Sequence, residues 1–269
     1  MSQRFGVKTR YCSVVRPPVD VQPPAAWLAD LERRHLADLR LSEVSRALRA
    51  LSSAYVERRQ TALPGGRALD GAGKRAAFAL YYGPLHFMAA TAILAGSTEN
   101  GARSGTVIDV GCGTGAVGAA AAAWLGAPAI TGLDTHPWAL DEARHTYAAF
   151  GLAATLHRGS AGRLRRPRGP AFIVAGYVAN ELPGAERERL LEALAESARH
   201  GCGLLVIEPL ARALTPWWPS WVSALAPLGA VAAEWKLDLP PPDIVRRLGA
   251  AAGLTAGAVN ARSLLRWPG

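Results

Sequence analysis

Four residues between positions 109 and 115 have the types and the spacing of a ligand-binding turn. A predicted strand ends near Asp109, and Gly111, Gly113 and Gly115 follow at alternate positions. Glycine adopts backbone angles that other residues avoid and places no Cβ against a ligand. The N terminus of the following helix presents unpaired N–H groups. The segment therefore predicts a strand–turn–helix loop that holds a ligand against its backbone.

A carboxylate, Asp134, comes near the end of the next predicted strand, where an acid can accept hydrogen bonds from ribose hydroxyls. A dinucleotide-binding fingerprint is the rival interpretation, because Gly113, Gly115 and Gly118 also spell GxGxxG. Two features speak against this interpretation. The carboxylate of Asp109 would repel a pyrophosphate, and the GxGxxG pattern would begin at Gly113, two residues after the glycine that directly follows the strand. A glycine turn without a ligand would leave the spacing of Asp134 unexplained.

Polar residues also follow two later predicted strands: Asn180 and Glu181 after one, and Glu208 at the end of the next. In open α/β folds ligands bind at this carboxyl edge of the sheet, and a carboxylate there can orient a nucleophile or accept its proton. These three residues are the candidate catalytic set. Alternatively, Asn180 caps the next helix and Glu208 is an ordinary loop acid. An apolar predicted helix adds three further polar candidates, Tyr81, Tyr82 and His86.

The segment VIDVGCGTG resembles the first motif of class I S-adenosylmethionine-dependent methyltransferases, and GLD at 132–134 resembles the second. The resemblance implies that S-adenosylmethionine is the cofactor and that Asp134 binds its ribose. It also implies that the methionine part is lined by the turn residues Asp109, Gly111, Gly113 and Gly115. Ser160 stands where the family often has an aspartate that contacts adenine. The NPPY-type motif of amino-methylating enzymes and the Pro-Cys motif of cytosine-C5 enzymes are absent.

A looser resemblance covers most of the chain. Together with the glycine turn, it involves the segments LSEVSRALRALSSAYVERR, KRAAFALYYGPLHF, YVANEL and IEPLARALTPWW. These are similar to segments of bacterial relatives of the mitochondrial small-ribosomal-subunit methyltransferase-like family. The resemblance implies an RNA acceptor, including ribosomal RNA, or a non-catalytic factor that binds S-adenosylmethionine and assists assembly of the ribosomal small subunit. A methyltransferase acting on a small-molecule substrate is the third interpretation.

Cysteine usage and charge bear on metals and partners. Cys12, Cys112 and Cys202 are far apart and form no CxxC pair, so no disulfide framework and no metal site is predicted. The extra cysteines that carry an iron–sulfur cluster in the looser family are missing. A net charge of +9 favours a polyanionic partner, and the run RLRRPR at 163–168 could bind phosphates. Only three lysines occur, and such arginine-rich composition is also typical of GC-rich genomes.

The elements that must position these residues alternate between strand and helix from Thr106 onward, which predicts βαβ units and a parallel sheet. The expected fold class is α/β, with a Rossmann-like seven-stranded methyltransferase sheet over residues 105–269. A helical N-terminal region, 1–104, precedes it. Its predicted helices are 27–40, 41–59 and 75–94, and Pro84 should kink or restart the last.

The remaining expectations concern location and aromatic residues. No apolar run is expected to reach the roughly 18 residues that span a bilayer, and the N-terminal segment lacks the apolar region of a secretory signal. We therefore expect a cytoplasmic protein with no membrane partner; the oligomeric state stays open. A tryptophan-rich segment, Trp217, Trp218 and Trp221, could stack on bases, or serve as core or lid packing.

Overall fold

The computed structural model describes residues 10–11, 19–58, 69–97 and 104–269. Its centre is an eight-stranded sheet in the order β1-β7-β8-β6-β5-β2-β3-β4. All neighbours are parallel except β8, which is antiparallel to β6 and β7. The strands are β1 (Arg10–Tyr11), β2 (Thr106–Val110), β3 (Ala129–Asp134), β4 (Ala153–Arg158), β5 (Phe172–Gly176), β6 (Gly203–Pro209), β7 (Val231–Asp238) and β8 (Ala258–Arg266). The predicted seven-stranded Rossmann-like sheet is confirmed in β2–β8, and the short β1 extends it at the β7 edge.

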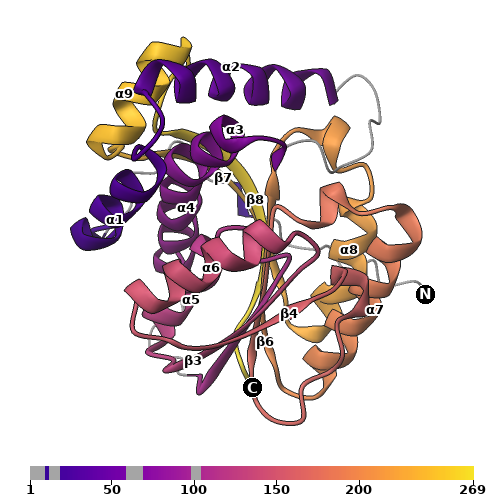
Figure 1. Ribbon diagram of the computed structural model, residues 1–269. Helices are drawn as coiled ribbons and strands as arrows, with labels where there is room; N and C mark the ends of the chain where they lie inside the picture. Colours follow the sequence, from indigo (N-terminus) through magenta and orange to yellow (C-terminus); the bar gives the residue numbers. More distant parts are fainter. Residues whose placement is uncertain (1–9, 12–18, 59–68, 98–103) are drawn as a thin grey trace.

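Helices cover both faces of the sheet, which Figure 1 shows nearly edge-on. The N-terminal helices and α4, α5, α6 and α9 lie on one side, while α7 and α8 lie on the other. The helices are α1 (Ala25–His35), α2 (Leu41–Arg58), α3 (Ala72–Ala77), α4 (Gly83–Ala95), α5 (Ala116–Leu125), α6 (Pro137–Ala149), α7 (Gly184–Arg199), α8 (Trp218–Leu225) and α9 (Asp243–Ala252). The outcome is a three-layer sandwich with one hydrophobic core on each face of the sheet.

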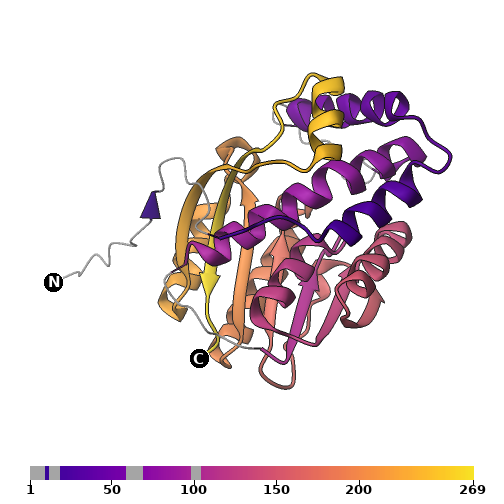
Figure 2. The same ribbon diagram turned by 90° about the vertical axis from the view of Figure 1, so that its left-hand side faces the viewer.

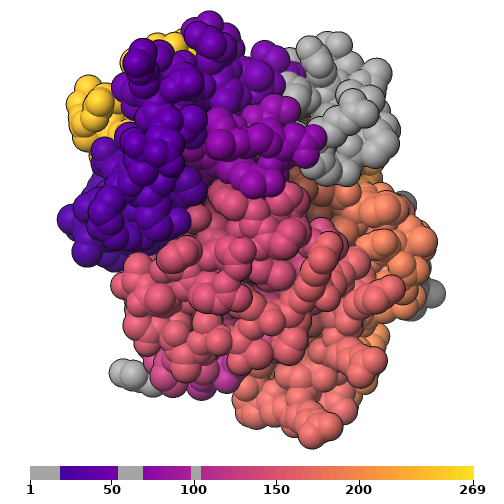
Figure 3. Space-filling view, in the orientation of Figure 1, coloured from indigo at the N-terminus to yellow at the C-terminus, as the bar shows by residue number. Residues whose placement is uncertain are grey.

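The larger core joins the N-terminal helices to the sheet. It contains Trp27, Leu48 and Met88 from the N-terminal region together with Val107, Val174 and other residues of the strands. Helix α5 is rich in alanine, and these small side chains let it lie close to α4. Figure 2 shows α2 above one end of the sheet beside α9, and Figure 3 shows the N-terminal helices packed directly against the following segments.

The apolar helix around Pro84, for which the sequence predicts a kink or a restart, continues through a π-helical turn that ends just before the proline. A π-helical turn, Phe78–Tyr82, joins α3 to α4, so one helical segment runs from Ala72 to Ala95. Proline lacks the N–H that a helix interior needs, and π turns often occur at functional sites.

This same segment corrects the expectation about apolar runs. Within the described residues, Ala72–Ala95 is long and apolar enough to cross a membrane by length and composition, but 78% of its apolar window is buried inside the protein. It packs as a core helix between the N-terminal helices and α5.

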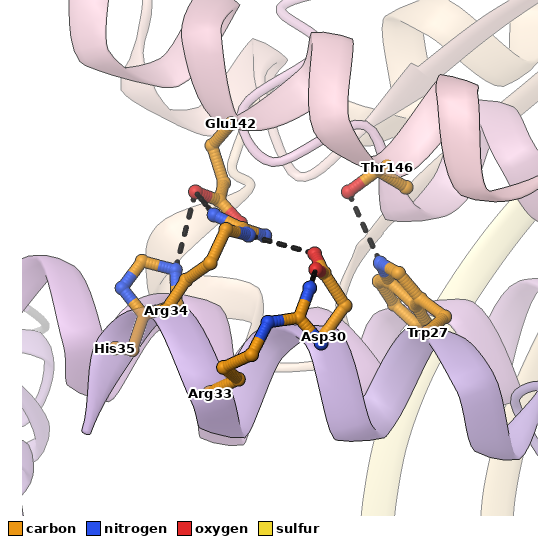
Figure 4. A network of polar contacts seen from close by, with 7 residues as sticks. All are labelled: Trp27, Asp30, Arg33, Arg34, His35, Glu142 and Thr146. Carbon is orange, nitrogen blue, oxygen red and sulfur yellow. Dashed lines mark hydrogen bonds and ion pairs between the residues drawn. The ribbon is translucent and has the colours of Figure 1, made fainter. Parts of the chain in front are cut away.

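A buried polar cluster fastens α1 to α6 (Figure 4). Two hydrogen bonds of 2.7 and 2.8 Å run from the Arg34 guanidinium to the carboxylate of Glu142, and His35 lies 3.1 Å from the same carboxylate. Beside them the indole N–H of Trp27 donates to the Thr146 hydroxyl at 3.3 Å. The cluster thus adds polar contacts between the N-terminal region and α6 to their shared apolar core.

Candidate functional site

A cavity of about 570 Å³ lies at the carboxyl ends of β2, β3, β4 and β5. This volume is in the range of small-molecule sites. Its lining comes from the sheet edge and also from the N-terminal region, which contributes Ser52, Leu69 and the segment around Phe78. Seven of the nine predicted site residues line it: Asp109, Gly111, Gly113, Asp134, Ser160, Asn180 and Glu181. Gly115 and Glu208 support it from outside the lining.

The three turn glycines have positive φ angles, and the space beside them explains in two ways why a side chain is absent. A Cβ on Gly111 (φ +66°) would lie 2.2 Å from a methyl group of Val178, and one on Gly115 (φ +77°) would lie 2.8 Å from the Tyr147 ring. A Cβ on Gly113 (φ +52°) would meet nothing closer than Phe78, at 3.9 Å. Gly111 and Gly115 therefore permit close packing, whereas Gly113 leaves open the space that a ligand would fill.

Asp109 holds this loop from inside the protein. Its side chain is buried, and its Oδ2 accepts hydrogen bonds from the Tyr147 hydroxyl at 2.8 Å and from the Gly118 N–H at 3.1 Å. Burial raises the pKa of Asp109 to about 7, although both hydrogen bonds act in the opposite direction. A Cβ on Gly118 would lie 2.2 Å from Oδ2. The third glycine of the apparent GxGxxG pattern is therefore explained by the position of this carboxylate.

Asp134 lies at the rim of the cavity where β3 ends. Its Oδ2 accepts from the N–H of Gly113 at 2.9 Å, and its Oδ1 accepts from the N–H of His136 at 2.8 Å. The carboxylate thus joins the glycine turn to the start of α6. A carboxylate has about four acceptor sites, so these two bonds leave capacity for the hydroxyls of a ligand.

Ser160 caps the short helical turn after β4 and is paired with a residue that sequence reasoning missed. Its hydroxyl accepts from the N–H of Gly162 at 3.2 Å and donates to the carboxylate of Glu186. Glu186 lies in the first turn of α7 and lines the cavity. Its distance from Ser160 in the sequence gives no signal of this contact. The pair places a carboxylate beside Ser160, the position for which the sequence resemblance implies a contact with adenine.

A strained turn after β5 carries Asn180 and Glu181. Tyr177 (φ +59°) is the one non-glycine residue of the described chain with a positive φ, a conformation that costs free energy and persists where the surroundings enforce it. The side-chain amide of Asn180 donates to the Tyr177 carbonyl at 3.0 Å and to Glu208 at 2.7 Å. Glu208 also accepts from the Ala179 N–H at 2.8 Å.

Glu208 is fully buried at the end of β6. Burial raises the pKa of its carboxyl to about 8, against the effect of its hydrogen bonds. Its bonds to Ala179 and Asn180 keep the turn in place, and Pro209 rather than Glu208 faces the cavity. Glu181, in contrast, is exposed at the lining. The structure thus brings Asn180 and Glu181 to the cavity and leaves Glu208 behind them.

Four aromatic side chains, which we name the aromatic wall, line the cavity opposite the glycine turn: Phe78, Tyr82, His86 and Tyr177. The rings of His86 and Tyr177 are stacked with centroids 4.1 Å apart and planes 18° apart. The Phe78 and Tyr82 rings lie 5.7 Å apart. Burial lowers the pKa of His86 to about 4, so its ring is neutral near pH 7. Sequence reasoning proposed Tyr82 and His86 but missed Phe78 and Tyr177.

The charged residues of the lining are all acidic. They are Asp109, Asp134, Glu181 and Glu186, and no lysine or arginine lines the cavity within the described part of the chain. Four arginines lie in the segment that leaves the cavity after Ala161 and leads to the start of β5 at the opposite edge of the sheet. The exposed residues Arg163, Arg165, Arg166 and Arg168 follow directly after Ser160 and Ala161, which do line the cavity.

The three tryptophans of the segment 217–221 are not among the residues that line the cavity, whereas Cys112 is. Trp217 lies against α7 beneath the Arg187 guanidinium, while Trp218 and Trp221 are buried in the core under α8. Packing is therefore the role that the structure supports for these tryptophans. Cys112 and Cys202 are buried free thiols, and Cys12 is outside the described residues. Among the residues that the structure describes, no group of three or more His, Cys, Asp or Glu side chains could hold a metal ion.

Residues 107–201 match the family described as a methyltransferase domain. That segment contains the glycine turn, Asp134, Ser160 and the turn after β5. No curated protein matches the chain in sequence.

Several solved structures resemble the chain. The mitomycin 7-O-methyltransferase MmcR is 19% identical, with a TM-score of 0.46 over 93% of this chain and 74% of its own. An O-methyltransferase family protein from Burkholderia thailandensis is 16% identical, with a TM-score of 0.47 over 76% and 62%. The tRNA (uracil-54, C5)-methyltransferase of Pyrococcus abyssi, solved with S-adenosyl-L-homocysteine, is 12% identical, with a TM-score of 0.41 over 70% and 38%. Both small-molecule and RNA acceptors therefore occur among these proteins.

Proposed function

We propose that this chain is a class I S-adenosylmethionine-dependent methyltransferase and that it methylates RNA, with a base as the acceptor; the methyltransferase-domain match over residues 107–201 and the order of the strands support the first part. The bound cofactor supplies an electrophilic methyl group on a sulfonium. Positioning of the acceptor then contributes most of the rate enhancement, since a neutral nucleophile needs no strong base for such a displacement. The residues of the cavity must therefore hold two ligands side by side.

The cofactor would be held along the ends of β2, β3 and β4. The open space at Gly113 fits the methionine part, and the free acceptor sites of Asp134 fit the ribose hydroxyls. Ser160 and Glu186 would face the adenine, because the Glu186 carboxylate is an acceptor for an exocyclic amino group. Asp109, bonded to Gly118 and Tyr147, would fix the turn rather than touch the ligand.

The observation that carries the RNA proposal is the placement of charge. Phosphate oxygens need cations, and four exposed arginines lie in the segment between Ala161, which lines the cavity, and the start of β5; Arg163 is the nearest of them in sequence to the lining. A base needs an uncharged planar surface, and the aromatic wall offers one inside the cavity. The phosphates of an RNA strand would thus lie outside on the arginine run while one base enters. An RNA acceptor also agrees with a cytoplasmic location, and ribosomal RNA is the acceptor class to test first.

Within the acceptor side, Glu181 is the residue we propose for orienting the nucleophile or taking its proton. It is exposed at the cavity lining just past β5, and a carboxylate in that role typically contributes 10²–10⁴-fold. Asn180 and Glu208 would act as positioning residues, because their hydrogen bonds are made to each other and to the backbone of the turn.

A small-molecule acceptor is the second candidate function. The lining that favours it is acidic and aromatic and contains no described lysine or arginine. Such a cavity would accept a free aromatic compound as readily as a base. The two candidates differ in whether the arginine run outside the cavity takes part.

The test uses labelled S-adenosylmethionine and a cell extract separated into RNA, protein and metabolites. We expect label in the RNA fraction, with binding that weakens as salt rises because arginine contacts release counterions. Replacing the four arginines Arg163, Arg165, Arg166 and Arg168 with serine should flatten that dependence by about 0.7 in slope for each lost contact with a single strand.

The matched control removes the same charge elsewhere. Exposed arginines paired within their own helices, Arg33, Arg144, Arg199 and Arg246, are changed to serine instead. Equal slopes for the two quadruple variants would remove the arginine run from the proposal. Label confined to metabolites would establish the second candidate in place of RNA.

A further inference from the structure

The acceptor half of the cavity differs in character from the cofactor half. The cofactor half consists of backbone and carboxylates, namely the glycine turn, Asp134 and the Ser160–Glu186 pair. The other half is the aromatic wall of Phe78, Tyr82, His86 and Tyr177. Phe78 is 3.9 Å from the point where a Cβ on Gly113 would lie, so the wall begins directly across from the turn. A ligand held by the turn would have the wall as its neighbour.

The local fold explains how the wall is assembled. Phe78, Tyr82 and His86 are four residues apart along the helical segment that contains the π turn, so they project in one row. His86 packs edge-on against the Phe78 ring at 6.3 Å and face-on against Tyr177 at 4.1 Å. The Glu208–Asn180 hydrogen bonds hold the turn that carries Tyr177. The wall is therefore a rigid surface built from two distant parts of the chain.

Charge completes the description of this half. The wall itself carries no charge, since burial keeps the His86 imidazole neutral and raises the pKa of Tyr82 to about 12. The charged lining residues are carboxylates, among them Glu181 on the turn and Asp109 beneath the glycines. Because no lysine or arginine is among the described lining residues, an anionic group placed here would be desolvated beside carboxylates, which is costly.

We infer that the aromatic wall is the acceptor subsite and that it selects an uncharged or cationic planar ring while rejecting an anionic one. The inference rests on the proposed function only in taking this cavity as the place of methyl transfer. It states what enters the cavity: a ring that stacks on the His86–Tyr177 pair, with any phosphate or carboxylate of the same substrate kept outside. Stacking gives affinity without base-specific hydrogen bonds, so the wall selects for shape and charge.

The experiment titrates the full chain, saturated with S-adenosylhomocysteine, with three nearly isosteric probes that differ in charge: benzamide, benzamidine and benzoate. Binding is followed by saturation-transfer NMR, which registers weak ligands. Occupancy of the cofactor half by S-adenosylhomocysteine directs the probes to the remaining space. We expect benzamide and benzamidine to bind, and we expect the affinity for benzoate to be lower by at least about tenfold. Benzoate binding as tightly as benzamide, or no binding by any probe, would overturn the inference.

Variants connect the binding to the wall. His86→Leu should weaken benzamide binding about tenfold, whereas His86→Phe, which keeps a flat ring, should retain it. Both should leave the affinity for S-adenosylhomocysteine unchanged. His145→Leu, at an exposed position of α6, is the matched control. Phe78→Leu repeats the test if the first variant is unstable. Unchanged benzamide affinity in a folded wall variant would refute the assignment.

This experiment is separate from the test of the RNA proposal. If extract RNA is never methylated but the probes bind as expected, the acceptor is a small planar compound and the subsite stands. If RNA is methylated while the wall variants bind the probes like the wild type, the RNA proposal stands and the subsite is wrong.

Discussion

At the scale of single residues, the glycines of the turn meet two different requirements, close packing and space for a ligand, which look alike in the sequence. Gly111 and Gly115 are glycines because Val178 and Tyr147 occupy the space of a side chain. Gly113 is different, because the volume beside it is open and belongs to the cavity. A substitution at Gly113 should therefore affect ligand binding more than packing, although its positive φ adds strain in either case.

Gly113→Val tests this separation. We expect its affinity for S-adenosylmethionine to fall at least about a hundredfold, because the side chain would fill the ligand's space. That is about 2.7 kcal/mol. The control is Gly151→Val, since Gly151 also has a positive φ (+67°) but no atom within 4 Å of its Cβ position. The control should show a comparable loss of melting temperature with normal binding by calorimetry. Full affinity in Gly113→Val would remove the turn from the cofactor site.

Glu181 and Glu208 are both carboxylates near the same turn, and their surroundings give them different roles. Glu181→Gln should lower turnover and leave the cofactor affinity and melting temperature unchanged, because it removes a charge at the lining. Glu208→Gln should act on stability, because it alters the hydrogen bonds to Ala179 and Asn180. A fall in melting temperature for Glu181→Gln without loss of turnover would show that this residue only braces the loop.

The stability effect of Glu208 has a defined dependence on pH. Its pKa rises from an ordinary value of 4.5 to about 8 on folding, so the folded protein binds the proton more tightly than the unfolded chain. Stability from this group is therefore fully present below pH 4.5 and is lost as pH rises through about 8. The melting temperature of the wild type should accordingly fall relative to that of Glu208→Gln between pH 5 and 8. A constant difference would show that the carboxyl ionises normally.

At the scale of elements, the contact between α1 and α6 depends on one buried acid. Burial alone would raise the pKa of Glu142, but hydrogen bonds and charge from Arg34 and His35 outweigh it and lower the pKa to about 2. The folded protein thus favours the ionised form. This contribution is fully present above pH 4.5 and is lost as pH falls through about 2.

Glu142→Gln should lower the free energy of unfolding at pH 7 by about 3 kcal/mol, because it leaves the Arg34 guanidinium without its buried partner. It should also reduce the fall in melting temperature that the wild type shows below pH 4.5. The control is Asp141→Asn at the neighbouring position, where the ion pair with Arg144 is exposed and should contribute less than about 1 kcal/mol. Equal melting temperatures for both variants would show that the buried pair contributes nothing.

At the scale of the whole molecule, the N-terminal helices and the sheet share one core. Trp27, Leu48, Met88 and Ile93 pack in the same cluster as Val107, Val174 and Ile207. The helical segment at Phe78–His86 also supplies most of the aromatic wall. Division of the chain at residue 104 would therefore cut through both the core and the cavity.

The segment 105–269 expressed alone tests that dependence. We expect it to lack a cooperative thermal transition, because the apolar face of α5 that packs on α4 would be exposed. Heat-induced unfolding measured by circular dichroism, with the full chain as the control, decides the matter. A cooperative transition together with S-adenosylmethionine binding would show that the two regions are independent domains.

The sequence by itself determined those strands and helices that the pattern of neighbouring residues predicts. Alternation of short apolar strands with helices from Thr106 onward predicted the seven strands β2–β8 and the helices between them, because such local pattern is set by neighbouring residues. The spacing of Asp109, the glycines and Asp134 predicted the ends of β2 and β3 and their meeting at one edge.

Only the tertiary structure decided which side chains face one another. The Glu186–Ser160 pair, the stacking of Tyr177 on His86 and the burial of Glu208 all join residues that are distant in the chain. The local sequence pattern does not predict such contacts, because they depend on how α4, α7 and the turn after β5 pack above the sheet. The chemical type of each residue was visible in the sequence, but its burial and partners, which set its pKa and its role, came from the fold.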